Sequence, residues 1–193
     1  MEITEDYVRK TIEEIAPLVE DLSGLKCDLK DYSVWIDKNY NFNERLAHYT
    51  PIVKMFVTGD NFKEGNIDYF KTVIGHEVMH NAQYSSFPEF EEEIRNSLME
   101  SWANGEKIKD YHIINKLIEG DATLIQRELN KEYFKKSRMN FLGMPLIHTK
   151  DIYLKNYSYH QWEKKLRDKF GTDRNQINKL YNYSLEDLTK VFE

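Results

Sequence analysis

The residues of this chain best suited to chemistry are two histidines and a glutamate within one short stretch. His76, Glu77 and His80 form the pattern His-Glu-x-x-His. Residues four apart on a helix lie on one face, so His76 and His80 can present two imidazole nitrogens to a single point. Zinc binds imidazole at about 2.0–2.1 Å and prefers tetrahedral coordination. The spacing predicts part of a zinc site, with Glu77 placed as a general base and not as a ligand.

The sequence around the motif predicts the helix that this geometry needs. No proline stands between Ile67 and Phe87. Apolar residues recur there at helical spacing, namely Phe70, Val73, Ile74, Val78 and Ala82. Gly75 costs a helix about 1 kcal/mol relative to alanine, which predicts that it admits a close neighbour, either another backbone or a substrate. A metal-free helix with two solvated histidines is the alternative interpretation of the motif.

A catalytic zinc site needs a third protein ligand, because its fourth position is left to water. The metzincin pattern is excluded, since it requires Gly and His where this chain has Gln83 and Ser86. The remaining candidates are carboxylates on later helices. Glu119 lies in an apolar run with Gly120 beside it for close approach, which is typical of an inward-facing ligand.

Glu100 is the rival third ligand. It lies twenty residues after His80, and Asn104 follows it by four residues. That spacing also occurs in thermolysin-type sites. The residue pattern taken alone leaves both glutamates open.

The motif helix, with His76-Glu77-Val78-Met79-His80-Asn81-Ala82-Gln83, and the later segment Glu119-Gly120-Asp121-Ala122-Thr123 together resemble the gluzincin metallopeptidases. They are most similar to small prokaryotic and archaeal members that have an HExxHALQ helix and a later EGxAT helix. The resemblance covers the chain from about Tyr49 to the C-terminus. It favours Glu119 over Glu100 as the third ligand, and it implies a zincin-like α+β fold that holds one Zn²⁺ per chain.

The chain departs from its apparent relatives at two positions. Thermolysin has Asp four residues after its glutamate ligand, where this chain has Thr123, and the family tail has Gly where this chain has His160. The contact that orients a ligating histidine must therefore come from another side chain. Gln83, one turn beyond His80, and Asp121 are the candidates.

The activity that the resemblance implies is zinc-dependent hydrolysis of peptide bonds in a peptide or protein substrate. Zinc activates a bound water molecule, and Glu77 acts as the general base. In this pattern a strand before the motif helix pairs with extended substrate, and 52–57 is the stretch in the right place. The candidates for stabilising the oxyanion are Tyr153, Tyr157, Tyr159, His148 and His160, of which the resemblance favours Tyr157. A catalytically silent or latent zinc-binding regulatory or interaction domain of the same fold is the alternative.

Composition limits the classes of partner and compartment. The chain has 193 residues, of which 40% are hydrophobic, enough for one domain with lobes of about 1–85 and 86–193. The net charge is −6 and the basic residues are dispersed, which argues against nucleic-acid or anionic-membrane partners. A single cysteine, Cys27, allows no internal disulfide, and no signal peptide or membrane span is visible. We therefore expect a cytoplasmic protein.

The rest of the chain predicts a small sheet followed by a helical half. A capped helix is expected from Thr4 to Ser23-Gly24, with a kink or break at Pro17. The predicted strands are 32–36 and 52–57. Beyond the motif helix we expect helices at about 90–104 and 111–134, and then short helices in the last fifty residues. The predicted fold class is α+β.

Overall fold

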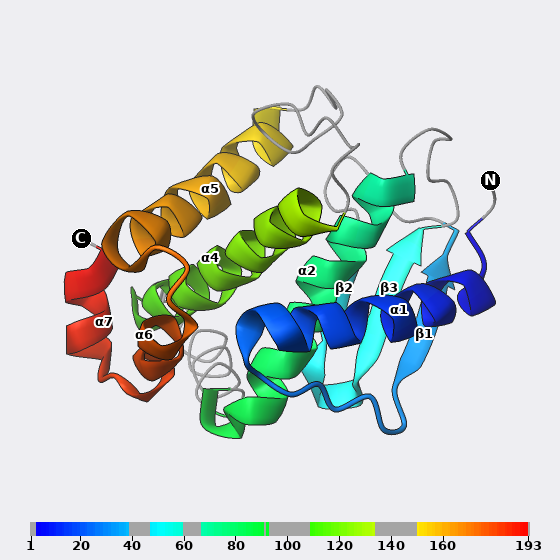
Figure 1. Ribbon diagram of the computed structural model, residues 1–193, viewed down its shortest axis with the longest axis horizontal. Helices are drawn as coiled ribbons and strands as arrows, with labels where there is room; N and C mark the ends of the chain where they lie inside the picture. The colour runs from blue at the N-terminus through cyan, green and yellow to red at the C-terminus, as the bar shows by residue number, and fades with distance from the viewer. Residues whose placement is uncertain are drawn as a thin grey trace.

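The computed structural model describes residues 3–38, 47–59, 67–90, 92, 109–133 and 150–192. In chain order, its elements are α1 (Glu5–Ser23), β1 (Ser33–Asp37), β2 (Ala47–Thr50), a 3-10 turn η1 (Pro51–Val53), β3 (Met55–Gly59), α2 (Ile67–Ser86), α4 (Lys109–Glu132), α5 (Lys150–Phe170), α6 (Arg174–Lys179), a second 3-10 turn η2 (Leu180–Asn182) and α7 (Leu185–Phe192). A small mixed sheet near the N-terminus is followed by a mainly helical remainder (Figure 1). The predicted α+β class is confirmed.

Helix α1 begins and ends where its capping residues predict. The Thr4 hydroxyl accepts a hydrogen bond from the backbone N–H of Tyr7, and Gly24 adopts φ 70° at the C-terminal end. The helix runs unbroken through Pro17, so the predicted break is wrong. Pro17 lies on the exposed side of α1. Water can therefore reach the carbonyl that loses its helical hydrogen bond there.

The sheet has the order β1-β3-β2, with β1 parallel and β2 antiparallel to the central strand β3. The strand predicted at 52–57 is corrected, because Pro51–Val53 form η1 and Lys54 has φ 45°. Strand β3 therefore begins only at Met55. Both of its sides are already paired, so it cannot also pair with a substrate. The edge strand β2 was not predicted, since its four residues have no clear apolar alternation.

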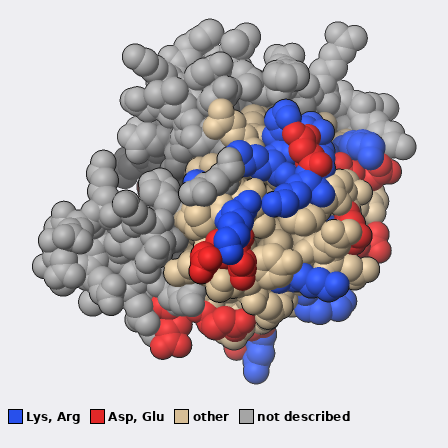
Figure 2. All heavy atoms as spheres, turned by 90° about the vertical axis from the view of Figure 1, so that its left-hand side faces the viewer, with Lys and Arg blue, Asp and Glu red and all other residues tan. Residues whose placement is uncertain are grey.

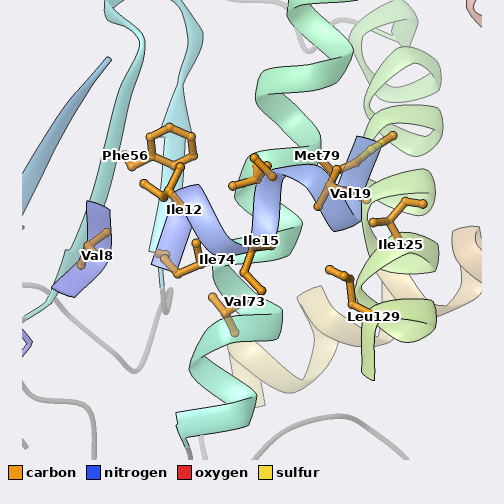
Figure 3. Packing of buried hydrophobic residues seen from close by; sticks show 14 of the residues in the cluster. Val8, Ile12, Ile15, Val19, Phe56, Val73, Ile74, Met79, Ile125 and Leu129 are labelled. Carbon is orange, nitrogen blue, oxygen red and sulfur yellow. The ribbon is translucent and has the colours of Figure 1, made fainter. Parts of the chain in front are cut away.

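The main hydrophobic core lies between the sheet, α1, α2 and α4. Its side chains come from all these elements, as Figure 3 shows for Val8, Ile12, Ile15, Val19, Phe56, Val73, Ile74, Met79, Ile125 and Leu129. Each fully buried side chain of this size contributes about 1.5–3 kcal/mol. This core packs α2, which carries the His-Glu-x-x-His motif, against the sheet on one side and against α4 on the other.

A second buried cluster joins α4 to the C-terminal helices. It contains Leu117 and Ile118 of α4, Leu166 of α5, Tyr181 of η2 and Phe192 of α7. The prediction of only short helices near the C-terminus is wrong at α5, which has 21 residues. No helix in the described part of the chain is both long and apolar enough to cross a membrane.

Two glycines allow the helices to approach closely, but the close neighbour of Gly75 is a side chain and not the predicted backbone or substrate. A Cβ atom at Gly75 would lie 2.3 Å from Leu129 Cδ1, so α2 packs here against a side chain of α4. A Cβ atom at Gly120 would lie 3.1 Å from both the backbone carbonyl carbon and Cβ of Trp162. Helix α5 therefore crosses α4 next to Glu119.

Opposite charges lie beside one another on the side of the molecule where α6 and α7 are found (Figure 2). Lys190 pairs with Glu186 at 2.9 Å and with Asp187 at 3.2 Å, and Lys164 pairs with Asp168. All five side chains are well exposed. Exposed pairs of this kind contribute only about 0–1 kcal/mol each, so this face adds little to stability.

Candidate metal centre

Helices α2 and α4 bring His76, His80 and Glu119 together. Oε2 of Glu119 lies 3.2 Å from Nε2 of His76 and 3.5 Å from Nε2 of His80. One ligating atom from each residue lies within 4.8 Å of the other two. The two histidines share a face because they are four residues apart on α2, and Gly120 lets α4 and α5 pack closely beside Glu119. The three residues form a site able to hold one metal ion.

The two distances from Glu119 to the histidine nitrogens fit a shared metal ion. Ligands about 2.0–2.1 Å from a tetrahedral zinc ion lie about 3.3–3.4 Å from one another, close to the two distances from Glu119. Two imidazoles and a carboxylate are typical zinc ligands, although other divalent first-row ions accept the same set. The three residues could therefore hold a metal ion, and their types do not fix the identity of that ion.

The site is enclosed but not sealed. The side chains of His76, His80 and Glu119 are 11%, 10% and 18% exposed, respectively. Nδ1 of His76 is buried without a hydrogen-bond partner among the described residues. The three side chains therefore keep only limited contact with solvent.

Electrostatic coupling within the metal-free site is strong. Burial lowers the pKa of His80, but the carboxylate of Glu119, with help from Glu77, raises it by more, to about 9. Burial raises the pKa of Glu119, but the two histidines lower it by more, to well below its usual range. His80 and Glu119 thus stabilise each other's charged forms.

Glu77 follows His76 on α2 but is not one of the three residues that could hold the ion. It is buried, and its Oε2 accepts the backbone N–H of Tyr49 at 2.8 Å. Its charge adds to that of Glu119 in raising the pKa of His80. Asn81, one turn later on α2, donates to the Tyr49 hydroxyl at 2.9 Å. Helix α2 thus binds β2 through both the backbone and the side chain of Tyr49.

His80 is oriented by a contact that the sequence predicts. Its Nδ1 lies 2.8 Å from Oε1 of Gln83, and Nε2 of Gln83 donates to the Ile118 carbonyl at 3.0 Å. The same nitrogen donates to the Tyr181 hydroxyl at 2.7 Å, and that hydroxyl donates to Asp121 at 2.8 Å. Gln83 therefore contacts the histidine directly, whereas Asp121 reaches it through two other side chains.

Two members of this network could not be found from the sequence. The sequence assigns no role in the site to Tyr181, and Arg174 has no motif around it. Arg174 nevertheless binds Asp121 with two nitrogens, at 2.6 and 3.0 Å. No local signal connects residues that lie 53 and 60 positions from Asp121.

Of the five candidates for stabilising an oxyanion, the structure describes the side chains of two, Tyr159 and His160. The ring of Tyr159 on α5 stacks beside His76, with ring centroids 6.5 Å apart and planes 21° apart. His160 is half-buried on the same helix. The side chains of Tyr153 and Tyr157 lie outside the described residues, as does His148.

The rival ligand Glu100 also lies outside the described residues, together with most of the helix predicted at 90–104. Glu119 is thus the one of the two glutamates that the described structure places with the histidines. Comparison of the chain with protein-family models, with curated proteins and with solved structures finds no match.

Proposed function

We propose that this protein is a zinc-dependent peptidase of the gluzincin type, with a zincin-like fold. The observation that carries the proposal is the convergence of His76, His80 and Glu119 at metal-ligand distances, with the buried carboxylate of Glu77 beside them. A structural zinc site usually closes its fourth position with a protein ligand. Three ligands and a neighbouring glutamate are instead the set that hydrolysis needs.

Each residue has a separate role in this proposal. His76, His80 and Glu119 hold the ion. Bound zinc lowers the pKa of a water molecule towards about 7 and polarises a substrate carbonyl. Glu77 accepts the proton of the attacking water and passes it to the leaving amine. A carboxylate has lone pairs beyond the one that the Tyr49 N–H occupies, so Glu77 can accept this proton while it stays oriented.

The edge strand β2 is the proposed binding place for the substrate backbone. Among the described strands it has a neighbour on one side only. The N–H of Tyr49 points to Glu77 instead of β3, so β2 runs directly past the proposed base. An extended peptide added to this edge would bring its carbonyl to the metal site.

Tyr159 is the proposed stabiliser of the oxyanion. Its ring lies next to His76, on a helix that packs against α4. A hydroxyl positioned near developing negative charge contributes about 10²–10³-fold in rate. The family resemblance favours Tyr157, whose side chain lies outside the described residues.

The proposal is tested by metal-dependent cleavage of a mixed peptide library, followed by mass spectrometry. Chelator-treated protein should cut no peptide, and one equivalent of Zn²⁺ should restore cutting at the same bonds. The variant Glu119→Ala should not be restored. Wild type that binds zinc and yet cuts neither peptides nor unfolded proteins would contradict the peptidase and support the silent metal-binding domain.

A further inference from the structure

A chain of buried hydrogen bonds connects the C-terminal part of the protein to the candidate metal centre. It runs from Arg174 of α6 to Asp121 of α4, then to Tyr181 of η2, Gln83 of α2 and His80. Its four bonds measure 2.6, 2.8, 2.7 and 2.8 Å in that order. Asp121, Gln83 and Tyr181 are each at most 2% exposed. Water therefore does not compete for these bonds.

The charge of Arg174 sets the direction of every bond in the chain. A guanidinium can only donate, so both oxygens of Asp121 are acceptors. The Tyr181 hydroxyl must then donate to Asp121, which leaves its lone pair to accept from Gln83. Burial, together with Asp121, raises the pKa of Tyr181 well above 10, so the hydroxyl keeps the proton that it donates.

This direction continues to the metal ligand. Because the amide nitrogen of Gln83 is bound by Tyr181 and the Ile118 carbonyl, its oxygen must face His80. An oxygen accepts only, so Nδ1 of His80 must carry a proton. In a neutral imidazole, the lone pair then lies on Nε2, the atom that faces Glu119.

We propose that Arg174, Asp121, Tyr181 and Gln83 are positioning residues that hold His80 in the ring orientation and tautomer needed to bind the metal. The C-terminal segment then helps to orient a metal ligand, in addition to packing in the second hydrophobic cluster. This inference rests on the proposed function, because it assumes that His80 is a metal ligand.

His76 provides an internal contrast. Its Nδ1 has no hydrogen-bond partner in the part of the chain that the structure describes. Both histidines direct Nε2 at Glu119, but among the described residues only His80 has a hydrogen bond at its Nδ1. Removing the partner of a ligating histidine typically costs about 10–100-fold in metal affinity, and this loss should arise at His80.

Three variants separate the effect of this hydrogen-bond network from the effect of the surrounding fold. Tyr181→Phe removes one hydroxyl and keeps the ring, which stacks on Phe87 with centroids 4.5 Å apart. Gln83→Leu removes the direct partner of His80. Tyr183→Phe is the matched control, because it removes the hydroxyl of an exposed tyrosine two residues further along. Thermal unfolding of each variant shows whether it folds.

The first readout is zinc affinity, measured by competition with a chromophoric chelator. Gln83→Leu should lose about 10–100-fold and Tyr181→Phe about tenfold, whereas Tyr183→Phe should match wild type. In the Gln83→Leu background, Tyr181→Phe should cause no further loss of zinc affinity, because the hydrogen-bond network is already interrupted at Gln83. Independent, additive losses would indicate structural damage and overturn the inference.

The second readout needs no metal. The Nδ1–H proton of His80, observed by NMR in metal-free protein, should shift in Tyr181→Phe and stay unchanged in Tyr183→Phe. If wild type binds zinc and Tyr181→Phe alters neither affinity nor this proton, the inference fails while the metal site stands. If wild type binds no zinc but the proton shifts, the proposed function fails and the orienting chain remains.

Discussion

The backbone N–H of Tyr49 donates a 2.8 Å hydrogen bond to Oε2 of Glu77. This bond joins the edge of the sheet to the motif helix at the residue proposed as the base. Asn81, four residues after Glu77, binds the hydroxyl of the same tyrosine and also exchanges two hydrogen bonds with the backbone of Asp28. One face of α2 therefore positions the edge strand and the carboxylate relative to each other.

Replacing Glu77 by glutamine should separate chemistry from metal binding. The amide oxygen of Glu77→Gln can still accept the N–H of Tyr49, so the fold and the zinc content should be unchanged. An amide cannot serve as a general base, and cleavage should fall about 10²–10⁴-fold. The measurements are kcat on a cleaved peptide and zinc per chain. Full activity in this variant would exclude Glu77 as the base, and loss of zinc would make it a ligand.

The pH dependence of zinc affinity should show the state of His80. Its pKa of about 9 in the metal-free protein means that zinc must displace a proton from it at neutral pH. Affinity in chelator-buffered zinc should therefore rise about tenfold per pH unit between pH 7 and 9, and then level off. A flat profile over this range would contradict the coupling between His80 and Glu119.

The stability of the metal-free protein should follow the opposite trend. The folded-state pKa of His80 is raised above its unfolded value of about 6.5. The stabilising contribution is therefore complete below pH 6.5 and lost as pH rises through about 9. Urea unfolding of chelator-treated protein at pH 6 and pH 9 measures the difference.

Replacing Gly120 by alanine should weaken the crossing of α4 and α5. The new Cβ would lie 3.1 Å from the backbone carbonyl carbon of Trp162 and 3.2 Å from Cδ1 of Leu166. We expect a net loss of about 1–2 kcal/mol in the free energy of unfolding, because overpacking of 1–3 kcal/mol exceeds the gain in helix propensity. Leu166→Val should not restore stability, since the backbone contact remains.

Gly75→Ala is the comparison for this prediction. There the clash is with Cδ1 of Leu129, at the end of a side chain, so Leu129→Val should relieve most of the strain. Equal rescue at both glycines would contradict a backbone contact at Gly120. Urea denaturation of the four single and two double variants supplies the free energies.

Cys27 should react slowly with alkylating reagents in the folded protein. Burial, together with the charge of Glu20, raises the pKa of its thiol to about 12. Only the thiolate reacts, so at pH 8 iodoacetamide should modify folded protein at least about 100-fold more slowly than protein in urea. Mass spectrometry over time measures both rates. Equal rates would show that Cys27 is not enclosed, and slow modification also verifies that each variant above is folded.

The parts of the site that depend on local spacing could be predicted from the sequence. His76 and His80 share a face because they are one helical turn apart, and Gln83 reaches His80 for the same reason. The apolar run around Glu119 made it a candidate, and the family resemblance favoured it over Glu100. The bounds of α1 also follow from local capping chemistry.

The parts of the site and of the fold that depend on contacts between distant residues could not be predicted from the sequence. Arg174 and Tyr181 contact Asp121 from segments more than fifty residues away in the sequence. No periodicity in the sequence predicts these contacts. Strand β2 is four residues long, pairs with β3 along its whole length, and is also bound by Glu77 and Asn81 from α2. Tertiary contacts, not strand propensity, define it.

The most direct test of the account is the zinc content of purified protein after saturation with zinc and gel filtration. Wild type should hold one zinc per chain, and Glu119→Ala should hold little or none. Glu132→Ala is the matched control, since this exposed glutamate lies on the same helix and should leave zinc unchanged. Wild type without zinc, or Glu119→Ala with as much zinc as wild type, would contradict a metal centre at these three residues.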